Sequence, residues 1–112
     1  HNALLMIRDG ELTEFKATKV AVGGFTSENQ VYDLEEMDIR KGDVFYMTTD
    51  GYPDQFGGEK GKKLKIAVLK RILLEIHHLS MSEQKEYLVN YMKEWMGEHE
   101  QIDDICVIGI RI

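Results

Sequence analysis

An apolar segment that ends in an acidic turn occupies the middle of the chain: Val44-Phe45-Tyr46-Met47-Thr48-Thr49-Asp50-Gly51. Its unbroken apolar and β-favouring residues predict a strand over Val44–Thr49 that is buried on both faces. A second acidic pair, Asp103-Asp104, stands directly before another apolar segment, Ile105-Cys106-Val107-Ile108. Carboxylates that meet at strand ends raise each other's pKa unless a cation lies between them. The two motifs together predict a site for a hard cation with oxygen ligands, of the Mg²⁺ or Mn²⁺ kind.

Each motif alone has a simpler explanation. Asp50-Gly51 is typical of a turn after a strand, and Asp103-Asp104 of a solvated strand start, because Asp and Gly favour such positions. The two motifs together indicate a metal site more specifically than either motif does alone. Both motifs adjoin strands expected to be central in a sheet, where a short Asp side chain has few ways to avoid its neighbour.

The residues before the central segment predict more β-structure. Ala3–Ile7 is apolar, Asp9-Gly10 is a hairpin-type dipeptide, and Glu11–Phe15 alternates polar and apolar residues. Together these features predict a β-hairpin. We expect a loop over residues 17–30, which contain small polar residues and a Gly pair, and a strand over Val31–Ile39.

The residues after the central segment predict a loop, two helices and a closing strand. Glycines and the single proline fall within residues 51–63, so we expect a loop there. Helical periodicity begins at Leu64, and Ser80–Glu83 matches a capping box for a second helix that ends at Gly97. A last strand is expected over Ile105–Ile112. Strands and helices are segregated along the chain, which predicts an α+β fold with two consecutive helices packed on a mainly antiparallel sheet.

The composition limits the classes of function. The 112 residues suffice for one domain or part of one. Lys and Arg number 14 against 20 Asp and Glu, a net charge of −6, which argues against nucleic-acid binding because that requires a basic face. No segment reaches the roughly 18 apolar residues of a membrane span, so we expect no direct membrane contact. The lone Cys106 cannot form an internal disulfide, and we expect a cytoplasmic protein.

Residues 42–58 resemble the "GD…TDG…FG" segment of metal-dependent protein phosphatases of the PP2C-like, SpoIIE type. Gln101–Cys106 is similar to the family's "Q-x-D-D-x-T" strand start, which follows a two-helix stretch there as it does here. The opening His1-Asn2 resembles the end of the family's "A-G-H-N" motif. The resemblance covers essentially the whole chain, in order and spacing.

The resemblance implies a partial α-β-β-α sandwich, with residues 1–112 as the C-terminal portion of a single phosphatase domain whose N-terminal half is absent. It also implies a centre of two Mn²⁺ or Mg²⁺ ions per complete domain, which activates water to hydrolyse phosphoserine or phosphothreonine. The substrate would be a phosphorylated regulatory protein of bacterial-type signalling. Asp50 matches the metal ligand of "TDG", and Asp103 matches the ligand that opens the "DD" pair. Asp104 and Gly51 would support these ligands, and no other catalytic side chain is required.

The chain departs from the family's pattern at three points. The family's further metal-binding Asp, in a "GD…GHG" motif, lies upstream of His1, so we expect the chain alone to bind metal weakly and to be inactive or nearly so. Cys106 replaces the usual Thr, and we expect it to be a buried, inert thiol. The acidic residue after "TDG" is Asp54, within a Tyr-Pro-Asp-Gln-Phe-Gly-Gly variant.

A second function stays open at this point: a degenerate, non-catalytic phosphatase-like domain that binds proteins on the same scaffold. The presence of both Asp50 and Asp103 weighs against it. The residues upstream of His1 distinguish the catalytic function from the binding function. An acidic "GD…GHG" motif there favours catalysis, and its absence favours binding. We also expect the chain to form dimers through an exposed apolar face or an unpaired edge of its sheet.

Overall fold

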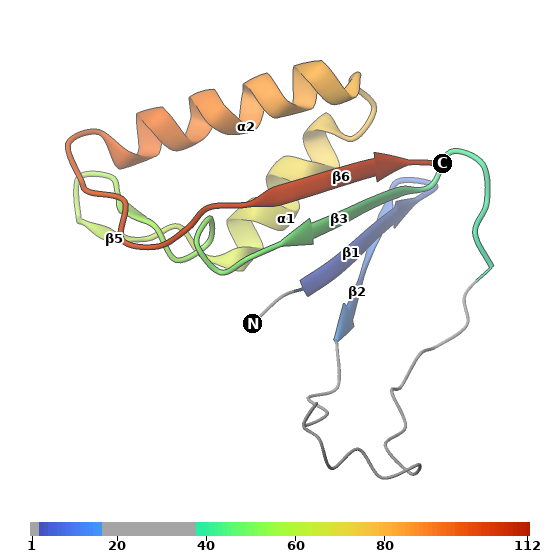
Figure 1. Ribbon diagram of the computed structural model, residues 1–112, viewed down its shortest axis with the longest axis horizontal. Helices are drawn as coiled ribbons and strands as arrows, with labels where there is room; N and C mark the ends of the chain where they lie inside the picture. The colour runs from blue at the N-terminus through green and yellow to red at the C-terminus, as the bar shows by residue number, and fades with distance from the viewer. Residues whose placement is uncertain (1–2, 17–37) are drawn as a thin grey trace, which may run out of the picture.

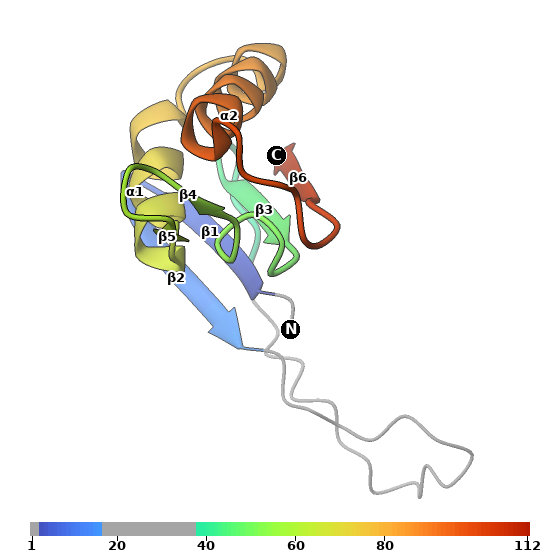
Figure 2. The same cartoon turned by 90° about the vertical axis from the view of Figure 1, so that its left-hand side faces the viewer.

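The computed structural model describes residues 3–16 and 38–112. An antiparallel sheet has the strand order β2-β1-β3-β6, and both helices lie on one of its faces (Figure 1, Figure 2). The elements in sequence order are β1 Ala3–Arg8, β2 Glu11–Lys16, β3 Val44–Thr48, β4 Phe56–Gly57, β5 Lys62–Lys63, α1 Ile66–Ile76, α2 Met81–Met96 and β6 Val107–Arg111. The predicted α+β fold is confirmed. The loop expected over residues 17–30 and most of the strand expected over Val31–Ile39 lie outside the described residues.

The N-terminal hairpin forms around the Asp9-Gly10 dipeptide, as predicted. Both residues have positive φ, 51° and 78°, which a two-residue hairpin turn of this kind requires. β1 and β2 then pair with Arg8 opposite Glu11. The turn therefore sets the register, and the alternation of polar and apolar residues along β2 decides which of its faces meets the core.

The core lies between the sheet and the two helices. Four side chains from β1 and β3 face the helices and are at most 2% exposed: Leu5, Ile7, Val44 and Tyr46. The Tyr46 hydroxyl donates to Oε1 of Gln84 in α2 at 2.5 Å, so the buried ring leaves no polar atom unpaired. Burial also raises the pKa of Tyr46 from its ordinary 10 to about 12.

The opposite face of the sheet is apolar, and its part over β3 and β6 is largely exposed within the described part of the chain, whereas Met6 of β1 is 7% exposed. Met47 of β3 is 49% exposed, and Ile108, its neighbour across the ladder, is 51% exposed. In the next pair, Phe45 is partly buried and Ile110 is 55% exposed. The expectation that β3 is buried on both faces is therefore wrong, because helices cover one face and leave the other open. An open apolar face is what half of an α-β-β-α sandwich presents to a second sheet.

Helix α1 begins at Ile66 and not at Leu64. Lys65 has a φ of 82°, which no helical residue adopts, and the Leu64 N–H donates to the carbonyl of Gln55 at 3.0 Å. Leu64 is 3% exposed, so it belongs to the core without belonging to the helix. The apolar periodicity continues into the loop before the helix, which is why the sequence pattern places the start too early.

Helix α2 has the boundaries that its capping residues predict. The Ser80 Oγ accepts from the N–H of Glu83 at 3.2 Å, and the helix ends at Gly97, whose φ is 52°. Leu88 and Met92 point into the core from this helix. Neither of the helices in the described ranges is long and apolar enough to cross a membrane.

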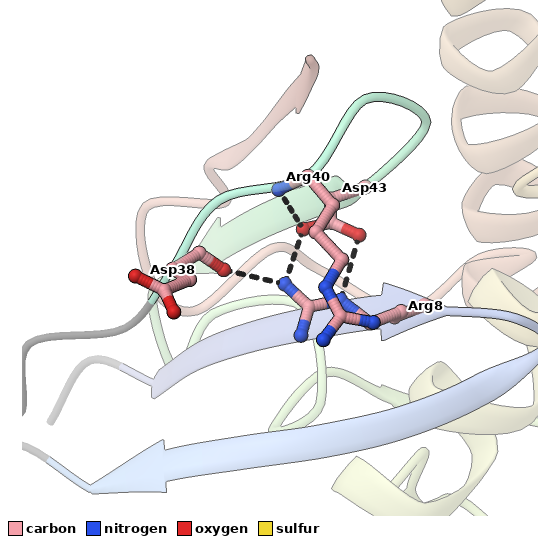
Figure 3. A network of polar contacts seen from close by, with 4 residues as sticks. All are labelled: Arg8, Asp38, Arg40 and Asp43. Atoms are coloured by element: carbon pink, nitrogen blue, oxygen red, sulfur yellow. Dashed lines mark hydrogen bonds and ion pairs between the residues drawn. The ribbon is translucent and has the colours of Figure 1, made fainter.

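A polar network closes the end of the sheet where β3 begins (Figure 3). Asp43, 2% exposed, accepts from Arg8 Nε on Oδ1 at 2.9 Å and from Arg8 Nη2 on Oδ2 at 2.6 Å. The N–H of Arg40 donates to the same Oδ2 at 2.9 Å, and Arg8 Nη2 also donates to the carbonyl of Asp38 at 2.7 Å. The N–H of Ile112 donates to the Asp43 carbonyl at 2.9 Å. This network, which we call the Asp43 clamp, ties β1, β3 and the end of β6 together.

Candidate metal centre

The acidic turn after β3 lies beside the acidic pair before β6. The two strands pair antiparallel with Thr48 opposite Val107, so residues that follow β3 run alongside residues that precede β6. The N–H of Thr49 continues this ladder by donating to the carbonyl of Cys106 at 3.1 Å. The segments that carry Asp50 and Asp104 are thus neighbours in space, although the two residues are 54 positions apart in the sequence.

The hydroxyl of Thr49 joins the two segments. Its Oγ1 donates to the carbonyl of Asp104 at 3.1 Å and accepts from the N–H of Cys106 at 3.2 Å. A hydroxyl can donate and accept at once, so one side chain satisfies main-chain groups on both sides of Ile105. Thr49 therefore fixes the position of the acidic pair relative to the turn of Asp50.

Gly51 sets how closely the two segments approach. A Cβ atom at this position would lie 2.0 Å from the carbonyl oxygen of Asp104 and 2.6 Å from its carbonyl carbon. Both atoms belong to the main chain, so no side-chain rotation relieves the clash. Only glycine permits this approach, so Gly51 acts as a spacer between the two acidic motifs.

The turn that begins at Asp50 is anchored on helix α2. The Asp50 carbonyl accepts from the N–H of Asp54 at 2.8 Å, which closes the turn. Within it, Tyr52 is 2% exposed and its hydroxyl donates to the carbonyl of Leu88 at 2.9 Å. Burial raises the pKa of Tyr52 well above its usual range. Asp50 itself is partly buried, so its carboxylate extends from a fixed main chain.

Asp103 and Asp104 lie on an exposed segment that leads into β6. The Oδ1 atom of Asp103 accepts from the N–H of Asp104 at 2.8 Å, which orients the carboxylate against its own main chain. The side chain of Gln101 donates to the Asp103 carbonyl at 3.0 Å. These local bonds orient the acidic pair, and both of its residues are exposed.

A buried residue that no sequence motif indicated, Gln55, joins the two acidic loops from the inside. Gln55 is fully buried, and its Nε2 donates to the carbonyls of Phe56 at 3.0 Å and of Glu100 at 2.8 Å. The indole N–H of Trp95 donates to the Gln55 carbonyl at 2.9 Å. Glu100 and Trp95 are 45 and 40 residues away, so nothing in the local sequence around Gln55 signals this role.

Cys106 is exposed, so the expectation of a buried thiol is wrong. The apolar character of residues 105–108 indicated a core strand. In the structure β6 is at the edge of the sheet and begins only at Val107, and Cys106 precedes it. In the described part of the chain, β6 has a neighbouring strand on one side alone, and the thiol of Cys106 lies at the surface.

The acidic residues fit a hard cation in part. Asp50 and Asp103 offer carboxylate oxygens, the donors that Mg²⁺ and Mn²⁺ prefer. Within residues 3–16 and 38–112, however, no three His, Cys, Asp or Glu side chains are grouped for metal binding. One or two carboxylates can hold a single Mg²⁺ when water and substrate phosphate complete its shell. A binuclear centre requires further ligands from outside the described residues, and the assignment of Asp50 and Asp103 as ligands stays a prediction.

Comparisons with known proteins identify the family. The family described as Stage II sporulation protein E (SpoIIE) matches residues 1–112. The chain belongs to the SpoIIE family. Among solved structures, the SiaA-PP2C domain of Pseudomonas aeruginosa is similar, with 32% sequence identity and a TM-score of 0.82 over 99% of this chain. No curated protein matches the sequence.

The family and the structural match confirm the resemblance found in the motifs. The chain is a PP2C-type segment of a phosphatase family, and its fold is part of the PP2C-like architecture. The SpoIIE-family chain described here covers 43% of the length of the SiaA-PP2C chain.

Proposed function

We propose that the domain containing this chain is a cytoplasmic, metal-dependent protein serine/threonine phosphatase that acts on a phosphorylated regulatory protein. The observation that best supports this function is the joining of two acidic motifs through Thr49 and Gly51. The main chains of the two acidic segments lie close together, and a cation between such segments would offset the repulsion of their negative charges. Asp50 and Asp103 would hold Mn²⁺ or Mg²⁺ at this position, with Asp104 and Gly51 in support.

The chain's own residues supply fixed positions for the reaction. When bound, a pair of such cations lowers the pKa of water and neutralises charge on phosphoryl oxygens. The ladder of β3 and the anchor of Tyr52 on α2 hold the turn of Asp50, and the Asp104 N–H orients the carboxylate of Asp103. Because Asp103 and Asp104 are exposed, a phosphorylated side chain of another protein can reach them. The scheme requires no protein nucleophile.

The alternative function is a protein-binding module on a degenerate phosphatase scaffold. One observation favours it: in the part of the chain that the structure describes, fewer than three potential metal ligands are grouped together. The sequence upstream of His1 separates the two functions, since an acidic motif there would complete the ligand set.

The test is hydrolysis of p-nitrophenyl phosphate and of a phosphothreonine peptide by a form of the protein extended upstream to a complete domain. We expect activity that requires Mn²⁺ and that falls roughly 100-fold or more in Asp50→Asn and in Asp103→Asn. Asp104→Asn should cost about 10-fold, as loss of a supporting group does. The 112-residue chain alone should show little or no activity.

Cys106→Ser is the matched control, because it alters an exposed side chain of the same segment without removing a carboxylate. It should retain activity. Metal-independent hydrolysis, or full activity in both Asp variants, would overturn the proposal. A complete domain that binds Mn²⁺ but never turns over phosphopeptides would favour the binding module.

A further inference from the structure

A groove of about 640 Å³ lies between helix α2 and the edge strand β6. The sheet side contributes Tyr46, Val107 and Gly109, and the helix contributes Leu88 and Met92. Its volume falls within the roughly 300–1,000 Å³ typical of small-molecule sites. This space belongs to neither of the acidic motifs, and the proposed phosphatase function makes no use of it.

The surface of the groove is apolar and adaptable. The hydroxyls of its two tyrosines are already engaged, Tyr46 with Gln84 and Tyr52 with the carbonyl of Leu88. Gly109 lacks a side chain, and a Cβ there would lie 3.3 Å from the Tyr46 ring, so larger residues would crowd this wall. Methionines on α2 complete the lining, and their flexible thioethers adjust to the shape of an apolar ligand.

The charge of the groove indicates the sign of its ligand. Among the described residues that line it, the charged ones are Lys85 and Lys93, although the chain has 20 acidic and 14 basic residues. They are eight positions apart on α2, which places them on one side of the helix about two turns apart. By contrast, the hollow at the end of α2 is lined by Glu59, Glu94 and Glu98. The groove is thus an apolar site whose charged lining residues are basic, on a chain with a net charge of −6.

We propose that this groove binds a free anionic amphiphile, a single-chain alkyl carboxylate of the fatty-acid class. The alkyl chain lies against Leu88, Met92 and Val107, and the carboxylate pairs with Lys85 or Lys93, whose long stems reach out from the helix. The occupant also contacts Ile105 and Cys106, which line the groove. It therefore touches the segment that Thr49 ties to the metal-centre candidate.

Cys106 provides a direct readout, because it is exposed, lines the groove and is the single cysteine of the chain. The experiment measures its alkylation rate with iodoacetamide, a neutral reagent, while decanoate is titrated below its micellar concentration. We expect decanoate to slow the alkylation of Cys106 several-fold and in a saturable manner. The heat of decanoate binding, measured by calorimetry, should follow the same concentration dependence. Acetate, which lacks the chain, and decanol, which lacks the charge, should slow the reaction little at equal concentration.

Charge reversal tests the partner of the carboxylate. The double variant Lys85→Glu with Lys93→Glu should raise the half-saturating decanoate concentration 10-fold or more. Lys60→Glu with Lys62→Glu is the matched control, since these lysines are exposed and lie outside the groove lining. No saturable change in alkylation or heat, equal protection by decanol, or equal affinity in both double variants would each overturn the proposal. Protection by anionic phospholipid vesicles without protection by decanoate would also overturn it, in favour of a membrane surface.

Discussion

Strand β3 has an aspartate at each end, and the two ends are built differently. Before the strand, Asp43 is buried and both of its oxygens accept hydrogen bonds, from Arg8 and from a main-chain N–H. After the strand, Asp50 is partly buried, and the Thr49 hydroxyl and the close approach at Gly51 position its turn. The Asp43 clamp neutralises a carboxylate with a cation of the chain itself. The Asp50 end instead brings two acidic segments close together, and the proposed function places a cation there.

The largest effect is expected at Gly51. Gly51→Ala places a Cβ 2.0 Å from the Asp104 carbonyl oxygen, so the main chain of one acidic segment must move. We expect a loss of about 3 kcal/mol in the free energy of unfolding and a loss of Mn²⁺-dependent activity in the complete domain. Urea denaturation and the phosphatase assay measure the two effects.

Gly97→Ala is the control for Gly51→Ala. No atom lies within 4 Å of a Cβ at Gly97, and its positive φ alone should cost about 1–2 kcal/mol. Activity should survive this change. Equal losses of stability and activity in both variants would show that the contact between Gly51 and Asp104 has no special role.

Asp43→Asn should have the next largest effect, on stability and not on catalysis. The change leaves Arg8, whose side chain is 24% exposed, without its counter-charge and breaks a bidentate pair. We expect the melting midpoint to fall by roughly 10 °C. Activity per folded molecule should be unchanged. Asp9→Asn, an exposed carboxylate in a turn that Asn also tolerates, should shift the midpoint by less than about 2 °C, and a similar shift in both variants would refute the clamp.

The pH dependence of stability should separate the two ends further. The hydrogen bond from Arg8 lowers the pKa of Asp43 from its ordinary 3.8 to about 2, against the opposing effect of desolvation. A carboxyl group with a lowered folded-state pKa adds stability above its unfolded pKa and loses it as the pH falls through the folded value. The stability difference between the natural protein and Asp43→Asn should therefore narrow between about pH 4 and pH 2. Urea denaturation over this range is the measurement, and a constant difference down to about pH 2 would contradict the assignment.

The smallest effect on folding is expected at the open face of the sheet. Ile108→Lys with Ile110→Lys changes two residues that are 51% and 55% exposed, so the free energy of unfolding should change by less than about 1 kcal/mol. Self-association of the 112-residue chain should weaken about 10-fold, because the charges interrupt an apolar surface. Light scattering at tens of micromolar compares the variant with Tyr87→Lys on α2, which should still associate. A strictly monomeric natural chain would contradict the expected dimer.

Much of the fold could be predicted because local chemistry determines it. Asp9-Gly10 specifies a tight hairpin turn, and Ser80 caps α2 through the Glu83 N–H. Such features depend on neighbours in the sequence. The short β4 and β5, two residues each within an expected loop, carry too little pattern to be recognised, and Trp95 from α2 packs against Gly57 there.

The burial of β3 and β6 could not be judged from the same kind of pattern. An apolar segment looks alike whether one face or both faces are covered, and Met47 and Cys106 both proved exposed. The Asp43 clamp was also missed, because Arg8 is 35 residues away from its partner. For the candidate site, the sequence singled out Asp50 and Asp103. It gave no sign of Thr49, whose hydroxyl joins their segments.

The most direct test of the contrast between the two ends of β3 is thermal unfolding of the complete domain with and without Mn²⁺. A bound ion raises the melting midpoint of any variant that can bind it, because it stabilises the folded state alone. We predict that Mn²⁺ raises the midpoint of the natural protein and, from a lower starting value, of Asp43→Asn by a similar amount, and leaves Asp50→Asn unchanged. A full Mn²⁺ shift in Asp50→Asn, or its loss in folded Asp43→Asn, would contradict the division between a structural end and a metal-binding end.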